Sequence, residues 1–432
     1  MNTELAQRAE DASTDACATA PSRTLRVAVV HDWLVIYGGA ERVLEHILDL
    51  YPEADLFSLI DFVPAEQRHF MRGKTPRTSF LQRIPGVARH YRKMLPLMPL
   101  AIEQFDLSDY DLIISSHYSV AKGVLTGPNQ VHVCYCHSPM RYAWDHYHVY
   151  LREMNLVRGL KSWFARWQLH HVRKWDALSA NSVDYFVANS QFVARRIAKF
   201  YRRDAKVIAP PVDTRLFALQ SEREDYYVCA GRFVPFKRID LVAEAFASMP
   251  DKRLILIGDG PEMEKIRAKA GPNCTFTGFL PPEQVRHYLS RARAFVFPSE
   301  EDFGIVPVEE QACGTPVIAF GRGGALETVV GWTERRALGE TVSGRPVEST
   351  QVTQVTQVAK VGAAFASGLF FDQQTPRSLM DAVIRFEEIS HELDAPSISA
   401  HAQHFSIESF KRRFAEAVAR ALAAHAGWKA AD

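Results

Sequence analysis

The sequence predicts an α/β protein in which two doubly wound domains face each other across a cleft. At 432 residues the chain is too long for one ordinary hydrophobic core. Short apolar runs alternate with helix-like segments in both halves, which is typical of parallel sheets covered by helices. The alternation is interrupted at residues 209–213, APPVD, and 220–225, QSERED, and then starts again. We therefore expect one domain on each side of this linker.

The expected first domain, residues 25–208, begins with the apolar run LRVAVVHDWL. A turn at Gly38 and Gly39 and the helical run AERVLEHILDLY follow. Four further strand candidates are ADLFSLI, YDLIISS, QVHVCYC and DYFVANS. The helical runs between them include residues 156–177 and 191–201. This order predicts a parallel sheet with helices on both faces.

The expected second domain, residues 209–405, repeats the pattern with the strand candidates YYVCAGR, RLILIGDGP, CTFTGFL, AFVFPS and PVIAFGRGG. Residues 331–367 differ from the rest, because the near-repeat VTQVTQVAK offers few positions for a core. We expect them to form a surface insertion. Helices of this domain are expected to start at Asp240, Glu262, Pro282 and Pro307.

The two ends of the chain differ in character. Residues 1–24 are polar and lack the apolar core of a secretory signal, so we expect a disordered tail. Residues 406–432 contain a helical run from Ile407 to Ala424. In a two-domain protein such a helix can pack back across the cleft onto the first domain.

The bulk composition excludes several classes of protein. The formal net charge of +1 argues against a nucleic-acid binder. No apolar run approaches the ~20 residues that a membrane-spanning helix needs. The six cysteines are scattered, mostly in strand-like runs, which predicts reduced thiols in a cytosolic protein. Cys134-Tyr135-Cys136 does not have the spacing of common zinc sites, so we expect no metal there.

Two acids eight residues apart, Glu301 and Glu309, flank a Phe-Gly turn after the apolar run ARAFVFP. Carboxylates accept paired hydrogen bonds from vicinal hydroxyls, so acids at a strand end suit a polyhydroxylated ligand. The alternative for Glu309 is stabilisation of a helix N-terminus, worth roughly 0.3–1 kcal/mol. That alternative does not explain the acids before the turn, residues 300–302.

Two cations, Arg232 and Lys237, lie in the segment GRFVPFK directly after the first strand of the second domain. Cations at a strand end, beside a helix N-terminus, form a good site for a diphosphate and would neutralise a departing pyrophosphate. The alternative is a pair of solvated surface charges.

Two glycine turns and one histidine complete the set of candidate residues. Gly323 and Gly324 follow a strand of the second domain, and the Gly38-Gly39 turn is their counterpart in the first. Glycines let a backbone approach a phosphate, although a simple tight turn explains both pairs equally well. His137 follows the strand QVHVCYC and should reach the cleft, whereas lone histidines are more often structural.

Two stretches of the first domain, residues 72–100 and 156–175, interleave Arg and Lys with Phe, Trp and Leu. This mixture suits an anionic membrane surface or a lipid phosphate. The alternative is an ordinary amphipathic helix whose apolar face lies in the core.

Taken together, these motifs resemble the retaining glycosyltransferases of family 4, which have the GT-B fold of two Rossmann-like domains. The resemblance covers nearly all of residues 26–371. It includes the two acids spaced as Glu301 and Glu309, and the Gly-Arg…Lys element that ends at Lys237. The longer segments HSPMRYAWD, NSQFVARRI, PPVD, EEDFGIVPVE and GRGGALETV look like the bacterial mannosyltransferases that build O-antigen and exopolysaccharide repeat units.

The resemblance implies roles for the acids and cations of the second domain. Arg232 and Lys237 would bind the donor diphosphate, and Glu309 would accept hydrogen bonds from the ribose. Glu301 would hold the hydroxyls of the donor sugar. The backbone amides that assist it would belong to Phe303, Gly304 and Ile305.

It also implies roles for the turns and the histidine. Gly38 and Gly39 would close over the phosphates, Gly323 and Gly324 would contribute to donor binding, and His137 would lie near the sugar. With no evident nucleophile in the protein, retention suggests front-face attack. No metal or other cofactor would be required.

The implied function is transfer of a sugar, above all mannose from GDP-mannose, to a saccharide on a polyprenyl diphosphate. The enzyme would then work at the cytoplasmic face of the inner membrane, in peripheral contact with it, and would not bind nucleic acid. Two alternatives stay open: a glucosyl- or galactosyltransferase that uses a UDP-sugar, and a protein that binds nucleotide sugars without turning them over.

Overall fold

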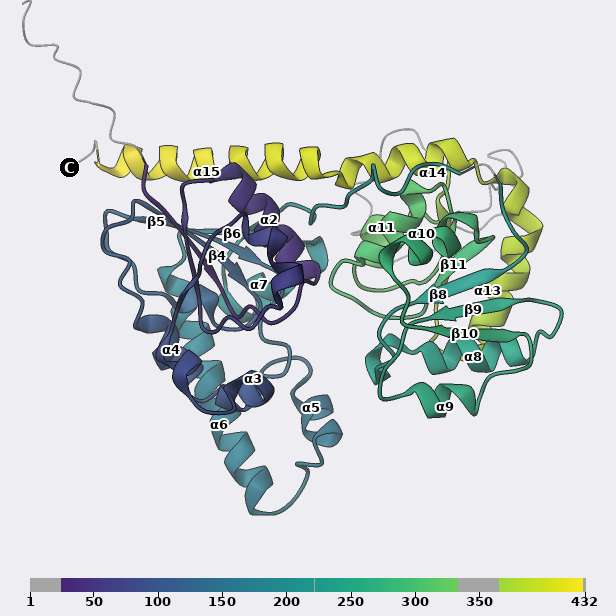
Figure 1. Cartoon of the computed structure of the whole chain (residues 1–432), viewed down its shortest axis with the longest axis horizontal. Coiled ribbons are helices and arrows are strands. Elements are labelled where there is room, and N and C mark those ends of the chain that lie inside the picture. The colour runs from purple at the N-terminus through teal and green to yellow at the C-terminus, as the bar shows by residue number, and fades with distance from the viewer. Residues whose placement is uncertain (1–24, 221, 333–364, 430–432) are drawn as a thin grey trace, which may run out of the picture.

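The computed structural model describes residues 25–220, 222–332 and 365–429. They form two parallel sheets with helices on both faces, in two domains side by side (Figure 1). The predicted fold class is therefore confirmed. The tail expected at 1–24 and most of the insertion expected at 331–367 lie outside the described residues.

The sheet of the first domain has the strand order β3-β2-β1-β4-β5-β6-β7, and all its strand pairs are parallel. The order reverses at β1, so ligand-binding loops are expected where β1 and β4 end. The strands are β1 (Val27–His31), β2 (Asp55–Ser58), β3 (Arg77–Thr78), β4 (Leu112–His117), β5 (Val131–Cys136), β6 (Tyr185–Ala188) and β7 (Ala205–Val207).

The sheet of the second domain has the order β10-β9-β8-β11-β12-β13 and is also parallel throughout. Here the order reverses at β8, so the loops after β8 and β11 flank the switch point. The strands are β8 (Tyr227–Ala230), β9 (Leu254–Ile257), β10 (Cys274–Gly278), β11 (Ala294–Phe297), β12 (Val317–Phe320) and β13 (Gly368–Phe371).

Helices cover both faces of each sheet (Figure 1). Those of the first domain are α2 (Gly39–Leu50), α3 (Val87–His90), α4 (Met98–Glu103), α5 (Tyr147–Glu153), α6 (Leu160–Ser179) and α7 (Gln191–Tyr201). The later ones are α8 (Ile239–Ala247), α9 (Met263–Arg267), α10 (Pro282–Arg291), α11 (Ile305–Ala312), α12 (Ala325–Thr328), α13 (Pro376–Ile389), α14 (Ala395–Ala402) and α15 (Ile407–Lys429).

Two expected helix starts were wrong by more than one residue. The helix expected from residue 156 begins at Leu160, because Gly159 before it has a φ of 88° and stands outside the helix. The helix expected from Pro307 begins at Ile305, after Gly304 with a φ of 90°. The second shift matters for the site, because it moves Glu309 out of the first helical turn.

The chain crosses between the domains twice, and the two crossings lie side by side. Val212 donates its backbone N–H to the carbonyl of Phe405 over 2.9 Å, and Thr214 Oγ1 donates to Gln403 Oε1 over 2.8 Å. After the second crossing α15 runs along the first domain (Figure 1). There Phe410 and other residues of α15 join the core cluster that contains α2 and β1.

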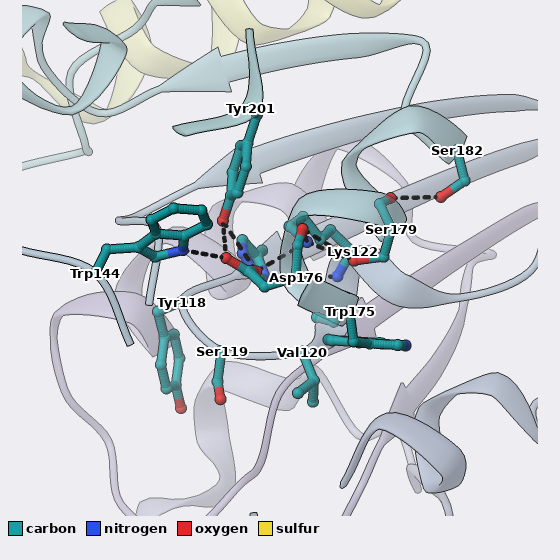
Figure 2. A network of polar contacts seen from close by, with 12 residues as sticks. Tyr118, Ser119, Val120, Lys122, Trp144, Trp175, Asp176, Ser179, Ser182 and Tyr201 are labelled. Carbon is teal, nitrogen blue, oxygen red and sulfur yellow. Dashed lines mark hydrogen bonds and ion pairs between the residues drawn. The ribbon is translucent and has the colours of Figure 1, made fainter. Parts of the chain in front are cut away.

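A buried ion pair connects four parts of the first domain (Figure 2). Lys122 Nζ lies 2.9 Å from Asp176 Oδ1, and neither side chain is exposed to solvent. Asp176, on α6, also accepts hydrogen bonds from Trp144 Nε1 at 2.7 Å and from the Tyr201 hydroxyl of α7 at 3.0 Å. Lys122 follows β4, so the pair also joins this fourth segment to α6, α7 and the loop after β5.

Among the described residues, no helix is long and apolar enough to cross a membrane.

Candidate active site

The loops at the carboxyl ends of the two sheets contact each other. Glu327, on α12, accepts hydrogen bonds from the backbone N–H groups of Gln191 and Phe192, at 2.7 and 2.9 Å. These are the first residues of α7, so a carboxylate of one domain caps a helix of the other. Sequence reasoning missed Glu327, because its partner is 136 residues away in the chain.

Lys237 and Glu301 meet where β8 and β11 end. Lys237 Nζ lies 2.5 Å from Glu301 Oε1, and Ser299 Oγ donates to the same oxygen over 2.7 Å. Since β8 and β11 are neighbouring strands, the loops that follow them share one site although Lys237 and Glu301 are 64 residues apart in the chain. Arg232 lies in the same loop as Lys237 and is exposed. The structure thus brings one predicted cation and one predicted acid into direct contact.

Glu309 is buried and pairs with an arginine of the other domain. Its Oε1 lies 2.6 Å from Arg42 Nη1 of α2, and its side chain is only 7% exposed. Burial lowers the pKa of the Arg42 guanidinium, but Glu309 outweighs this and the pKa lies above its usual value. Glu309 is the fifth residue of α11, so stabilisation of a helix N-terminus no longer explains it. Sequence reasoning did not identify Arg42.

The Gly38-Gly39 turn approaches the second domain closely. A Cβ atom on Gly39 would lie 3.2 Å from Ile305 Cδ1 at the start of α11. Gly38 donates its N–H to Glu41 Oε2 over 3.0 Å, which fixes the first turn of α2. The predicted donor-binding residues Gly38, Gly39 and Ile305 therefore lie together.

Gly323 and Gly324 pack against the loop that carries Glu301. A Cβ atom on Gly324 would lie 2.3 Å from the Cα of Phe303, and Gly324 donates its N–H to the carbonyl of Glu301 over 2.8 Å. Gly323 has a φ of 66°, and its Cβ would lie 2.5 Å from the same carbonyl oxygen. These glycines are required for the contact between two loops, and they hold the backbone of residues 301–303 in place.

His137 is partly buried directly after β5, in a chain of polar side chains. Its Nε2 lies 2.9 Å from Ser116 Oγ, and His31 Nδ1 lies 3.0 Å from the same hydroxyl. His31 Nε2 in turn lies 3.3 Å from Glu41 Oε1. Burial lowers the pKa of His137 to about 3, so the ring is neutral at physiological pH. His137 is thus suited to hydrogen bonding rather than to proton transfer.

His132, on the same strand, gives a prediction for the pH dependence of stability. Burial lowers the pKa of His132 to about 4, against about 6.5 in an unfolded chain. Between these values the unfolded state binds more protons, so this histidine makes the free energy of unfolding fall as pH falls below 6.5. Between these two pKa values, one such group changes the free energy of unfolding by up to about 1.4 kcal/mol per pH unit. His132→Gln should cost stability at pH 7, because it disturbs the hydrogen bonds of the ring with Ser115 Oγ at 2.8 Å and the Ser182 carbonyl at 3.2 Å. This cost should shrink toward pH 5, because only the unmodified protein loses stability through protonation of His132.

Urea unfolding of the unmodified protein and of His132→Gln across pH 5–7 measures this difference in the free energy of unfolding. A cost that stays constant over that range would show that His132 is not held neutral in the folded protein.

The chain matches family models over most of its length. Residues 37–216 match Glycosyltransferase Family 4, and residues 214–341 match Glycosyl transferases group 1. The chain therefore belongs to the glycosyltransferase family that these two models describe, as the resemblance of its motifs predicted.

Two relatives illustrate the similarity among curated proteins. The chain is 30% identical over 181 residues to the GDP-mannose-dependent α-(1-6)-phosphatidylinositol monomannoside mannosyltransferase of Mycolicibacterium smegmatis, covering 35% of this chain and 47% of that protein. It is 32% identical over 169 residues to the D-inositol 3-phosphate glycosyltransferase of Segniliparus rotundus, covering 33% and 38%. The chain thus matches less than half the length of these relatives.

Solved structures support the fold over nearly the whole chain. Anabaena HepE in complex with UDP and glucose aligns with a TM-score of 0.62 and 17% identity, covering 91% of this chain and 100% of that one. The lipopolysaccharide outer core galactosyltransferase WaaB, in its apo form, aligns with a TM-score of 0.58 and 14% identity, covering 91% and 99%. The two facing sheets therefore form the GT-B fold.

Proposed function

We propose that this chain transfers mannose from GDP-mannose, with retention of configuration, to a saccharide carried on a lipid diphosphate. The observation that carries the proposal is the group at the strand ends of the second domain, where Lys237 contacts Glu301 and Glu309 faces the first domain. The donor is supported by the relatives that are named as GDP-mannose-dependent mannosyltransferases. The acceptor, and a role in O-antigen or exopolysaccharide assembly, are supported by the resemblance of the motifs to those of polysaccharide mannosyltransferases.

In this proposal the second domain holds the donor. Lys237 and Arg232 neutralise the diphosphate, and Glu301 accepts hydrogen bonds from hydroxyls of the sugar. Arg42 engages one oxygen of Glu309, Oε1, so the ribose hydroxyls would bind the other. Gly323 and Gly324 act through the backbone of residues 301–303, which they hold in place.

The reaction then proceeds on one face of the sugar. The bond between the anomeric carbon and the diphosphate breaks as the acceptor hydroxyl forms a new bond from the same side. The departing phosphate oxygen takes the proton of that hydroxyl, so no protein base is needed. Neutral His137 would hydrogen-bond the sugar, and the two cations would stabilise the leaving charge without a metal.

The test is product formation from labelled GDP-mannose and polyprenyl-diphosphate saccharides, with the anomeric configuration read by NMR. An α-linked mannosyl product supports the proposal. Product from UDP-glucose or UDP-galactose instead would show that the donor is a UDP-sugar. Nucleotide-sugar binding without any product would indicate a protein that binds nucleotide sugars without turning them over.

We further propose that α5 and α6 contact the membrane that carries the acceptor. The segment that connects α5 to α6 and the N-terminal end of α6 project from the body of the first domain (Figure 1). The stretch also carries the exposed cations Arg152, Arg158 and Lys161, which suit anionic lipid. Its exposed large apolar side chains are Val149, Met154, Val157, Leu160, Trp163, Phe164 and Trp167.

Removing three of these apolar groups should weaken binding to anionic lipid vesicles at least tenfold, because each buries apolar area in the interface. The test variant is Leu160→Ser, Trp163→Ser and Phe164→Ser, whose side chains are 87%, 66% and 53% exposed. The matched control is Leu125→Ser, Leu216→Ser and Phe279→Ser, at 62%, 55% and 86%. Equal co-sedimentation of the two variants would contradict this membrane contact.

A further inference from the structure

A carboxylate of the second domain lies between two arginines of the first. Asp302 Oδ1 is 2.5 Å from Arg196 Nη1 and 3.4 Å from Arg141 Nη1. Asp302 directly follows Glu301, whereas Arg196 lies on α7 and Arg141 in the loop after β5. The three residues meet where the two domains contact each other, and Asp302 and Arg141 keep 22% and 23% of their side chains exposed.

The two arginines offer more hydrogen-bond donors than their present partners use. Arg196 is only 7% exposed, and its Nη2 is buried without a hydrogen-bond partner in the part of the chain that the structure describes. Its Nε lies 3.2 Å from Asp145, and its Nη1 also reaches Ser138 Oγ at 3.2 Å. Burial lowers the pKa of Arg141, and the charge of Arg196 acts in the same direction. Two like charges this close require an anion between them.

Without Asp302, the first domain alone keeps a net positive site. Asp145 then offsets only one of the two guanidinium charges, and both Nη1 groups lose their shared acceptor. A phosphate has several acceptor oxygens and matches the planar fork of an arginine, so it satisfies two guanidinium groups better than one carboxylate oxygen does.

We propose that Arg141 and Arg196 bind a phosphate group of the acceptor substrate, and that Asp302 occupies this place when no acceptor is bound. The site adjoins the reacting centre, because Ser138 follows His137 and Asp302 follows Glu301 in the chain. The accepting sugar would therefore carry its phosphate close to the attacking hydroxyl, as a sugar attached directly to a lipid diphosphate does. The inference rests on the proposed function and specifies the acceptor end of the same site.

The proposal predicts opposite effects for the two kinds of substitution. Arg141→Gln and Arg196→Gln each remove a phosphate ligand, so affinity for a diphosphate should fall at least tenfold. Asp302→Asn removes the competing charge, so the same affinity should rise several-fold. If the arginines served only to join the domains, Asp302→Asn would not tighten diphosphate binding.

The experiment is calorimetric titration of the full chain with inorganic pyrophosphate and with geranyl diphosphate. The protein is first saturated with GDP, or with UDP if that is the nucleotide it binds, so that the donor site is filled. Tightening by Asp302→Asn, together with loss in Arg141→Gln, supports the site. Tighter binding of geranyl diphosphate than of pyrophosphate would identify the ligand as a lipid-linked phosphate. Equal binding of the two would identify a phosphate site that does not sense the lipid.

Nucleotide affinity is the control that separates this inference from the proposed function. Each variant should bind the nucleotide within about twofold of the unmodified protein, which also shows that buried Arg196 has been replaced without unfolding. Nucleotide binding with no diphosphate binding, or weaker diphosphate binding in Asp302→Asn, would overturn the phosphate site alone. Failure to bind any nucleotide would overturn the proposed function itself.

Discussion

Replacement of Lys237 by alanine is expected to lower kcat about 10²–10³-fold, the usual cost of removing one charge-stabilising donor from an active site. The Lys237 ammonium lies 2.5 Å from Glu301 and would neutralise the diphosphate as it departs. Its loss removes a charge that acts most strongly in the transition state, so kcat should fall more than KM rises. Steady-state kinetics with GDP-mannose measure the change.

Lys269→Ala is the matched control. Lys269 is a partly exposed lysine of the same domain, and it pairs with Asp240 and Glu244 of α8 at 3.0 and 2.7 Å. Pairs of this kind contribute little to stability, and kcat should stay within about twofold of the unmodified protein. An unchanged kcat in Lys237→Ala, with an unchanged melting temperature, would show that this lysine does not serve the reaction.

Replacement of Lys122 by methionine is expected to destabilise the first domain by about 3–5 kcal/mol, because it leaves a buried carboxylate without its cation. Asp176 has no exposure to solvent through which water could replace the ammonium. Trp144 and Tyr201 still donate to Asp176, but they supply no charge (Figure 2). Chemical unfolding, followed by fluorescence, measures the loss.

The double variant Lys122→Met, Asp176→Asn tests whether charge is the cause. Asparagine keeps an oxygen that can accept from Trp144 or Tyr201 and removes the buried charge. The double variant should therefore be more stable than Lys122→Met alone, which a double-mutant cycle quantifies. A single variant that loses less than about 1 kcal/mol would show that Asp176 is accommodated without its partner.

The strands that are marked by a local run of apolar residues were predictable from the sequence. Apolar runs such as those at β5 and β11 are buried along their whole length, and their pattern needs no distant residue. Three strands were missed for physical reasons. β3 has two residues, β7 is only partly buried, and β13 follows directly after the segment interpreted as an insertion.

The candidate site was predictable only within each domain. The spacing of Glu301 and Glu309 follows from one strand and the helix after it. Lys237 and Glu301 could be placed near each other because both follow strand ends of the same sheet. The partners across the domain interface were not predictable, since Arg42 and Glu309 are 267 residues apart and nothing local distinguishes Arg42 on its helix. The close approach of the Gly323-Gly324 turn to Phe303 was not predictable either, because it is a contact between two loops.

The donor site at the strand ends of the second domain is tested most directly by a calorimetric titration of the protein with GDP-mannose, with UDP-glucose as the competitor. We expect GDP-mannose to bind and UDP-glucose not to displace it. We also expect Glu309→Ala to weaken the binding, because that carboxylate would hold the ribose. Binding of neither nucleotide sugar would contradict the assignment of a donor site to the strand ends of the second domain.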